Sequence, residues 1–292
     1  MNTEQEKNKT TGTDSRSVLG SGPRAAFKAF HRSLLLLQNP ILALPLFLYF
    51  LLKLGILALY IANTSLNLSP VWAFFIRGLT SEHLKHYPLH PIMMQTILGR
   101  LDIILDILVY VIFQGVTIAL VAAALTRQHI SLRDGFRTTF SRYFHLVIAA
   151  IATSVIMLVL INAPAMIVEQ MGGRAGAGIT TAGTIIGLII QALFLYIAPF
   201  ILLGRFSAFG AIGRSIRFAF RSIGTSMFLA IVPFILTLPT MLLTLRADVI
   251  AFRMSPDFLV HIQVAGEIMH FIANYLVIGG ATVYFISKGR MQ

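Results

Sequence analysis

Five ionisable side chains lie inside stretches of sequence that are otherwise almost entirely apolar: Lys53, Asp102, Asp106, Glu267 and His270. Asp102 and Asp106 are four residues apart, and Glu267 and His270 are three apart, so each pair would share one face of a helix. A charge at the centre of a membrane helix costs about 2.5–3.5 kcal/mol on insertion scales. Carboxylates, an imidazole and an amine at such depth could relay protons, bind a cation or hold another substrate.

These side chains would form one cluster if their helices begin at the same membrane surface. At about 1.5 Å per residue from the outer ends, Asp106 and His270 fall at similar depth, and the stem of Lys53 can extend outward. The candidate cluster consists of Lys53, Asp102, Asp106, Glu267, His270 and Asn274. We favour a structural interpretation, in which an interhelical ion pair is joined by residues that open their spans at headgroup level. The alternative is a proton or cation pathway or a substrate site.

One pattern within the cluster contains metal-ligand residue types. Glu267 and His270 form an E-x-x-H sequence, which builds di-iron sites in helical bundles when it occurs twice. Here it occurs once, and no second histidine accompanies Asp102 and Asp106. An embedded metal-dependent enzyme is therefore only a second alternative, and we expect no metal and no other cofactor.

A second group of possible metal ligands follows the first apolar stretch: Glu82, His83, His86 and His90. Three imidazoles and a carboxylate could hold zinc or copper. Their spacing suits one helix face, but Pro88 interrupts that helix. We favour a loop that lies on the outer membrane surface, and leave open whether the three histidines bind a metal.

The composition identifies the elements that must position these residues. Of 292 residues, 57% are hydrophobic and 12% are charged, whereas soluble domains contain about 25% charged residues. A soluble globule could not hide so many apolar side chains. Because the chain has no cysteine, disulfides, thiolate nucleophiles and cysteine-bound clusters are excluded. The fold class predicted is an all-α polytopic membrane protein.

Six stretches are long and apolar enough to span a bilayer, which takes about 20 residues. They cover residues 40–62, 101–125, 145–168, 179–203, 225–245 and 264–287. Prolines recur inside them, at Pro45, Pro164, Pro199, Pro233 and Pro239. Broken helices are typical of transporters, although proline can also produce a simple kink.

Glycines within the spans predict close helix packing inside the monomer. Gly183 and Gly187 form a G-x-x-x-G sequence, and Gly279 and Gly280 are adjacent in the last span. A dimer contact is the alternative that we favour less.

The basic residues predict the orientation of the chain. Six spans place both termini on one side, where 16 of the 23 lysines and arginines fall, against six on the other. By the positive-inside rule the termini are cytoplasmic, and we expect a multi-pass plasma membrane protein. Residues 1–23 are polar and form a predicted disordered tail, which precedes a six-span domain over residues 24–292.

Three basic segments precede the first, third and fifth spans, and they resemble one another. Their sequences are RAAFKAFHRSLLLL from Arg24, LRDGFRTTFSRYFHLV from Leu132 and AIGRSIRFAFRSIGTS from Ala211. Apolar residues recur every three or four positions with bases opposite, which predicts three amphipathic helices in the cytoplasmic interface. Their bases are Arg24, Lys28, Arg32, Arg133, Arg137, Arg142, Arg214, Arg217 and Arg221. The simpler alternative is that these are ordinary positive flanks of the spans.

These three motifs resemble those of a group of prokaryotic six-span proteins, over residues 25–287. The group includes the membrane domain attached to some glycerophosphoryl diester phosphodiesterases and related families of unknown function. The resemblance implies a membrane domain and no reaction, because the chain contains no soluble phosphodiesterase domain.

The leading functional hypothesis is a non-enzymatic integral membrane protein that acts on lipids, membrane organisation or a partner. The basic segments favour the bilayer, and anionic lipids in particular, as the partner, and we expect no nucleic-acid binding. The alternative is a transporter or channel for a small solute or ion. An enclosed polar cavity joining Lys53, Asp106 and His270 would favour transport, and tight packing there would favour the lipid hypothesis.

Overall fold

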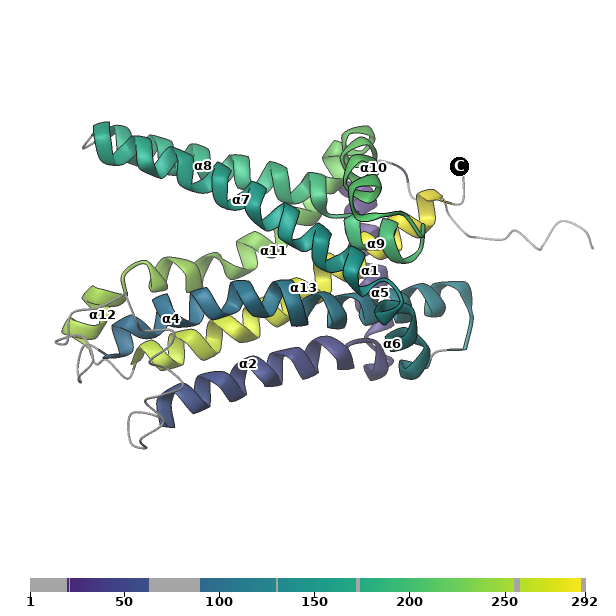
Figure 1. The fold of residues 1–292 in the computed structure, drawn as a ribbon, viewed down its shortest axis with the longest axis horizontal. Helices are drawn as coiled ribbons and strands as arrows, with labels where there is room; N and C mark the ends of the chain where they lie inside the picture. Colours follow the sequence, from purple (N-terminus) through teal and green to yellow (C-terminus); the bar gives the residue numbers. More distant parts are fainter. Residues whose placement is uncertain are drawn as a thin grey trace, which may run out of the picture.

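The computed structural model describes residues 20, 22–62, 90–129, 131–171, 174–254 and 258–289. Within these residues the chain is helical and contains no strand, which confirms the all-α fold class (Figure 1). The helices are α1 (Pro23–Leu36), η1 (Pro40–Leu42), α2 (Leu44–Ala62), α4 (His90–Leu105), η3 (Asp106–Tyr110), α5 (Val111–Thr126), α6 (Leu132–Phe140), α7 (Tyr143–Met171), α8 (Arg174–Phe194), α9 (Ile197–Leu202), α10 (Ala208–Arg221), α11 (Ile223–Thr244), α12 (Ala247–Arg253) and α13 (Phe258–Gly289).

Two predictions fall largely outside the described residues. Of the tail at 1–23, only Gly20, Gly22 and Pro23 are described. Glu82, His83 and His86 lie outside the described residues, and so does the side chain of His90. The disorder of the tail and the metal site in the outer loop therefore stay predictions.

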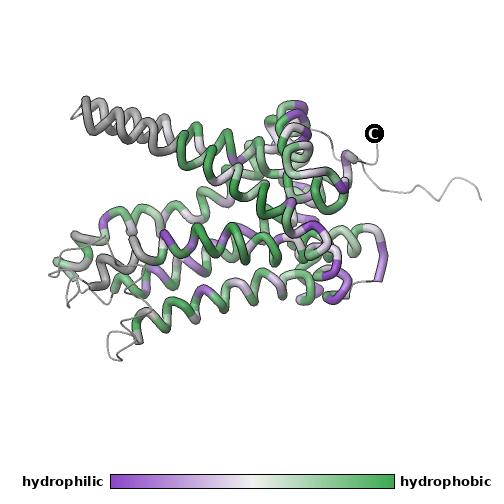
Figure 2. The backbone as a smooth tube through the Cα atoms, viewed as in Figure 1, coloured by the Kyte–Doolittle hydropathy of each residue, from purple (hydrophilic) through white to green (hydrophobic). Residues whose placement is uncertain are grey.

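The spans agree with the hydropathy analysis in type and order. Five segments are long and apolar enough to cross a membrane: Leu98–Thr126, Tyr143–Leu160, Gly183–Leu202, Ile223–Thr244 and Phe258–Lys288. The first predicted span corresponds to α2, whose apolar part, Leu44–Leu59, is shorter. Figure 2 shows apolar residues along these helices and hydrophilic residues gathered at one end of the bundle. The chain is a polytopic membrane protein.

The outer ends of two spans differ from the prediction in a way that changes the candidate site. The helix of the second span begins at His90, and that of the last span begins at Phe258. Asp102 and Glu267 therefore lie about 18 Å and 14 Å along their helices, at 1.5 Å per residue. Each acid is thus preceded by more than two helical turns, although the second apolar segment begins at Leu98, only four residues before Asp102. The depth of the two acids in the membrane stays a prediction.

The three basic segments form the helices α1, α6 and α10, which lie at the same end of the bundle as the end of α13 (Figure 1). Each helix buries small residues spaced four apart: Ala25, Ala29 and Ser33 in α1, Gly135 and Thr139 in α6, and Ala211, Ser215 and Ala219 in α10. Small side chains allow helix backbones to approach closely. The amphipathic helices are thus confirmed, and each is packed against the spans through its small face.

Two glycine pairs behave differently. A Cβ on Gly279 would overlap Ser33, and one on Gly280 would lie 3.0 Å from the ring of Phe30, so α13 needs both glycines to receive α1. This agrees with the prediction of close packing within the monomer. At Gly183 and Gly187, by contrast, a Cβ would have no neighbour within 4 Å in the described structure outside its own helix. Both glycines are nevertheless buried, so close packing of α8 within the monomer stays a prediction.

The span prolines have unequal effects. Pro233 and Pro239 lie inside α11 without ending it. The fourth span is interrupted between α8 and α9, just before Pro199, and Ser215 of α10 bridges the interruption. Its hydroxyl donates to the carbonyl of Leu193 at 2.6 Å and accepts from the amide of Tyr196 at 3.2 Å. A helix break of the kind found in transporters is present once among the described spans.

Candidate functional site

Lys53 is the centre of a buried ion-pair network in the outer half of the bundle. Its Nζ lies 3.2 Å from Oδ2 of Asp102 and 3.0 Å from Oε2 of Glu267. The side chains of Lys53 and Glu267 are 12% and 7% exposed. Gln263, one turn before Glu267, donates to the other oxygen of Glu267 at 3.3 Å. The network joins α2, α4 and α13, and it satisfies the amine of Lys53 with two carboxylates.

Asp106 occupies a different environment from the other two acids. Tyr49 donates a hydrogen bond to Oδ1 of Asp106 at 2.6 Å, while Asp106 itself remains exposed. It begins η3, a π-helical turn between α4 and α5. Such turns are rare and frequently occur at functional sites. Asp106 is therefore a carboxylate within a membrane span that is held by one hydroxyl and is still open to a ligand.

His270 and Asn274 complete the predicted cluster. Both line the same hollow as Asp106. Neither side chain makes a hydrogen bond with a described residue. Among those residues, no three His, Asp or Glu side chains are placed to hold a metal ion together. The carboxylate of Glu267 is occupied by Lys53, so the E-x-x-H pair does not present two free ligands.

The six residues of the predicted cluster line one cavity of about 210 Å³, which we call the outer cavity. The remaining lining residues are Leu46, Tyr49, Phe50, Tyr110 and Phe271. The structure thus brings together every residue of the predicted cluster. The tight packing that would have favoured the lipid hypothesis is absent among these described residues. The cavity is partly open rather than enclosed, because Asp106 and His270 are exposed.

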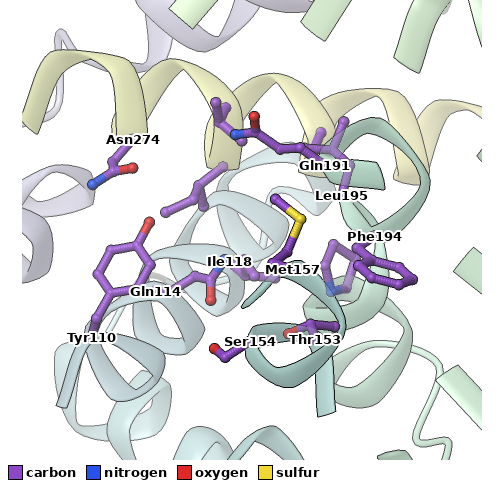
Figure 3. A pocket seen from close by; sticks show the side chains of 14 residues that line it. Tyr110, Gln114, Ile118, Thr153, Ser154, Met157, Gln191, Phe194, Leu195 and Asn274 are labelled. Carbon is purple, nitrogen blue, oxygen red and sulfur yellow. The ribbon is translucent and has the colours of Figure 1, made fainter. Parts of the chain in front are cut away.

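A second cavity of about 340 Å³, the inner cavity, adjoins the first, because Tyr110 and Asn274 line both. It lies closer to the basic end of the bundle, since α5 and α13 both run toward that end. Figure 3 shows its polar lining, to which η3 and α5, α7, α8 and α13 contribute. Its polar residues are Tyr110, Gln114, Thr153, Ser154, Gln191 and Asn274.

The outer cavity carries more negative than positive charge. Three carboxylates face it, at Asp102, Asp106 and Glu267, and one lysine, Lys53. With all four groups ionised their net charge is −2, and a protonated His270 could offset only half of it. Because charge is poorly screened at this depth, a bound cation would be stabilised there.

Sequence analysis missed several lining residues, although one signal was available. Asp106, Tyr110 and Gln114 recur every four residues, and this spacing puts polar groups on one side of an apolar helix. Tyr49 likewise lies one turn before Lys53. Gln191 had no such signal, because its place depends on how α8 packs against α7 and α11.

The predicted lipid-facing bases lie at the opposite end from the ion pairs. Arg142 is half-buried and the others are exposed: Arg24, Lys28, Arg32, Arg133, Arg137, Arg214, Arg217 and Arg221. The guanidinium of Arg214 lies 3.7 Å from the centroid of the Phe206 ring. Large aromatic side chains are exposed beside these bases, namely Phe27 at 65%, Phe140 at 55%, Phe209 at 72% and Phe220 at 62%.

Comparisons with known proteins add no family to these observations. No protein-family model matches the chain, and neither a curated protein nor a solved structure matches it.

Proposed function

We propose that this integral membrane protein moves a small cation, a proton included, across the membrane through the outer cavity. One observation carries the proposal: Asp106 is a carboxylate inside a membrane span that faces a cavity, and no base of the described residues forms an ion pair with it. Intramembrane acids are expensive to retain and usually mark ion or proton pathways.

The ion pairs of Lys53 supply the scaffold of this site. Lys53 neutralises one of the two carboxylates that it contacts, so Asp102 and Glu267 together keep a surplus of negative charge. A cation beside Asp106 would reduce that surplus.

The proposal is tested by flux into proteoliposomes that contain the full chain, with H⁺, Na⁺, K⁺ and tetramethylammonium as separate probes. We expect one probe to enter faster than in protein-free liposomes, and Asp106→Asn to reduce that rate at least tenfold. Asp134→Asn, which changes an exposed acid of α6, is the matched control. Flux equal to empty liposomes for all four probes, or flux unchanged in Asp106→Asn, would refute the proposal.

A second function has its own support at the basic end. Exposed bases and exposed phenylalanines alternate on α1, α6 and α10, whose opposite faces are packed on the spans. Basic residues near a membrane surface contribute about 1 kcal/mol each toward anionic lipid. We propose that these helices bind anionic headgroups, in keeping with the lipid hypothesis.

Both functions fit a non-enzymatic protein of a plasma membrane with cytoplasmic termini. The support for this orientation is the basic end itself, to which α1 and the end of α13 both belong. Kinship with the membrane domain attached to glycerophosphoryl diester phosphodiesterases is part of the same proposal.

A further inference from the structure

The inner cavity has a chemistry that cation movement through the outer cavity does not use. Of its 14 lining residues, drawn in Figure 3, none is Asp, Glu, Lys, Arg or His. Its polar groups are three amides, two aliphatic hydroxyls and one phenol, interleaved with apolar side chains such as Ile118, Met157 and Val277. It is a compartment without charged side chains, in which polar groups lie within a mostly apolar lining.

The amides of this compartment have no protein partners. The side chains of Gln114, Gln191 and Asn274 make no hydrogen bond with any described residue, and the same holds for the hydroxyl of Ser154. Thr153 differs, because its hydroxyl bonds back to the carbonyl of Ala149 at 2.9 Å. Gln191 is exposed, and Gln114, Ser154 and Asn274 are half-buried. These four groups therefore face the open space of the cavity, where water or a ligand can bind them.

The residues that line the inner cavity favour some classes of ligand over others. Each amide has hydrogen-bond donors and an acceptor, and each hydroxyl can donate or accept. Together they match a solute that has both hydrogen-bond donors and acceptors. A charged solute would enter without a counter-charge, at a high desolvation cost. The apolar side chains suit the C–H faces of such a molecule. A volume of about 340 Å³ is at the small end of ligand pockets, which span about 300–1,000 Å³.

We propose that the inner cavity is a binding site for a small, neutral, hydroxyl-rich group. Gln114 and Gln191 hydrogen-bond its hydroxyls from opposite helices, α5 and α8, and Ser154 contributes from α7. The group is either a free polyol or the uncharged sugar headgroup of a membrane lipid, since both have the same chemistry. The site does not depend on cation movement through the outer cavity.

The test is equilibrium binding of radiolabelled xylitol to the full chain in phosphatidylcholine nanodiscs, without any ion gradient. A parallel sample contains monogalactosyl diacylglycerol, whose retention by the protein is measured by mass spectrometry. We expect saturable binding of one probe, weakened about tenfold by Gln114→Leu and by Gln191→Leu, as loss of one good hydrogen bond predicts. Gln128→Leu, an exposed glutamine outside both cavities, is the matched control.

The outcomes distinguish the two sources of the ligand, a free polyol and a lipid headgroup. Xylitol binding without glycolipid enrichment identifies a free polyol, and glycolipid enrichment that displaces xylitol identifies a headgroup. If either leucine variant fails to fold, Ser154→Ala provides a milder variant. It should weaken the affinity for the probe by a few fold. The proposal is overturned if neither probe binds saturably, or if binding is equal in the wild type, Gln114→Leu and Gln191→Leu. A failed cation-flux experiment would leave these results unaffected.

Discussion

Tyr49 and Asp106 are joined by a hydrogen bond of 2.6 Å that ties the second helix to the π-helical turn of the second span. The hydroxyl fixes one oxygen of a carboxylate that lines a cavity and forms no ion pair with any described base. The bond has two consequences. It stabilises the contact between α2 and η3, and it leaves the other oxygen of Asp106 without a hydrogen bond to any described residue.

Tyr49→Phe should lower the free energy of unfolding by about 1–2 kcal/mol, because hydrogen bonds to charged groups contribute about 1.5–3 kcal/mol and cavity water can replace part of this one. The measurement is unfolding by sodium dodecyl sulfate in mixed micelles. Tyr143→Phe is the control, since Tyr143 donates to a neutral acceptor, the carbonyl of Leu108, at 3.0 Å in an exposed position. Equal losses in the two variants would contradict the special role of Asp106.

Lys53→Met should destabilise the protein by about 3–5 kcal/mol, the cost of leaving a buried partner charge uncompensated. Most of this cost arises at Glu267, because its side chain is only 7% exposed and its charge would lose its partner. The double variant Lys53→Met, Glu267→Gln should recover most of the loss, because the remaining acid, Asp102, is 29% exposed. Lys28→Met, at an exposed position, should change stability by less than about 0.5 kcal/mol. A double variant no more stable than the single one would contradict this coupling.

Gly280→Leu should destabilise the bundle by about 1–3 kcal/mol through overpacking. The first added carbon would already lie 2.9 Å from Cδ2 of Leu229 and 3.0 Å from Cδ1 of Phe30, so α1 and α11 would have to move. Gly55→Leu is the matched control, because a Cβ there has no described atom within 4 Å and the residue is exposed. The measurement is the same unfolding titration, and similar values for the two variants would show that α1 does not need Gly280.

The spans were predictable because membrane helices need long apolar runs, which hydropathy detects directly. Their ends were not, since His90 and Phe258 begin helices whose first turns contain polar residues. The apolar runs alone therefore placed Asp102 and Glu267 nearer to the ends of their helices than the structure does.

The composition of the outer cavity was predictable, but its shape was not. Lys53, Asp102 and Glu267 stood out because charge inside an apolar run is conspicuous. Local patterns do not reveal the π-helical turn at Asp106, which adds a residue to one turn and so rotates all that follows. The inner cavity depends on how α5 packs against α7 and α13 and on how α7 packs against α8. Such long-range contacts leave little trace in the spacing of Gln114 and Gln191.

Replacing Arg214, Arg217 and Arg221 together by Gln should reduce the preference for anionic lipid. These bases are exposed on one helix, α10, and at about 1 kcal/mol each their combined loss corresponds to roughly a hundredfold in affinity at most. The readout is enrichment of phosphatidylglycerol over phosphatidylcholine around the purified protein, measured by mass spectrometry at several salt concentrations. Arg246→Gln with Arg253→Gln, two exposed bases at the start and end of α12 near the opposite end of the bundle, is the control. Enrichment should fall with salt in the wild type, because the attraction is screened, and an enrichment that neither salt nor the α10 variant changes would exclude the basic end as the lipid site.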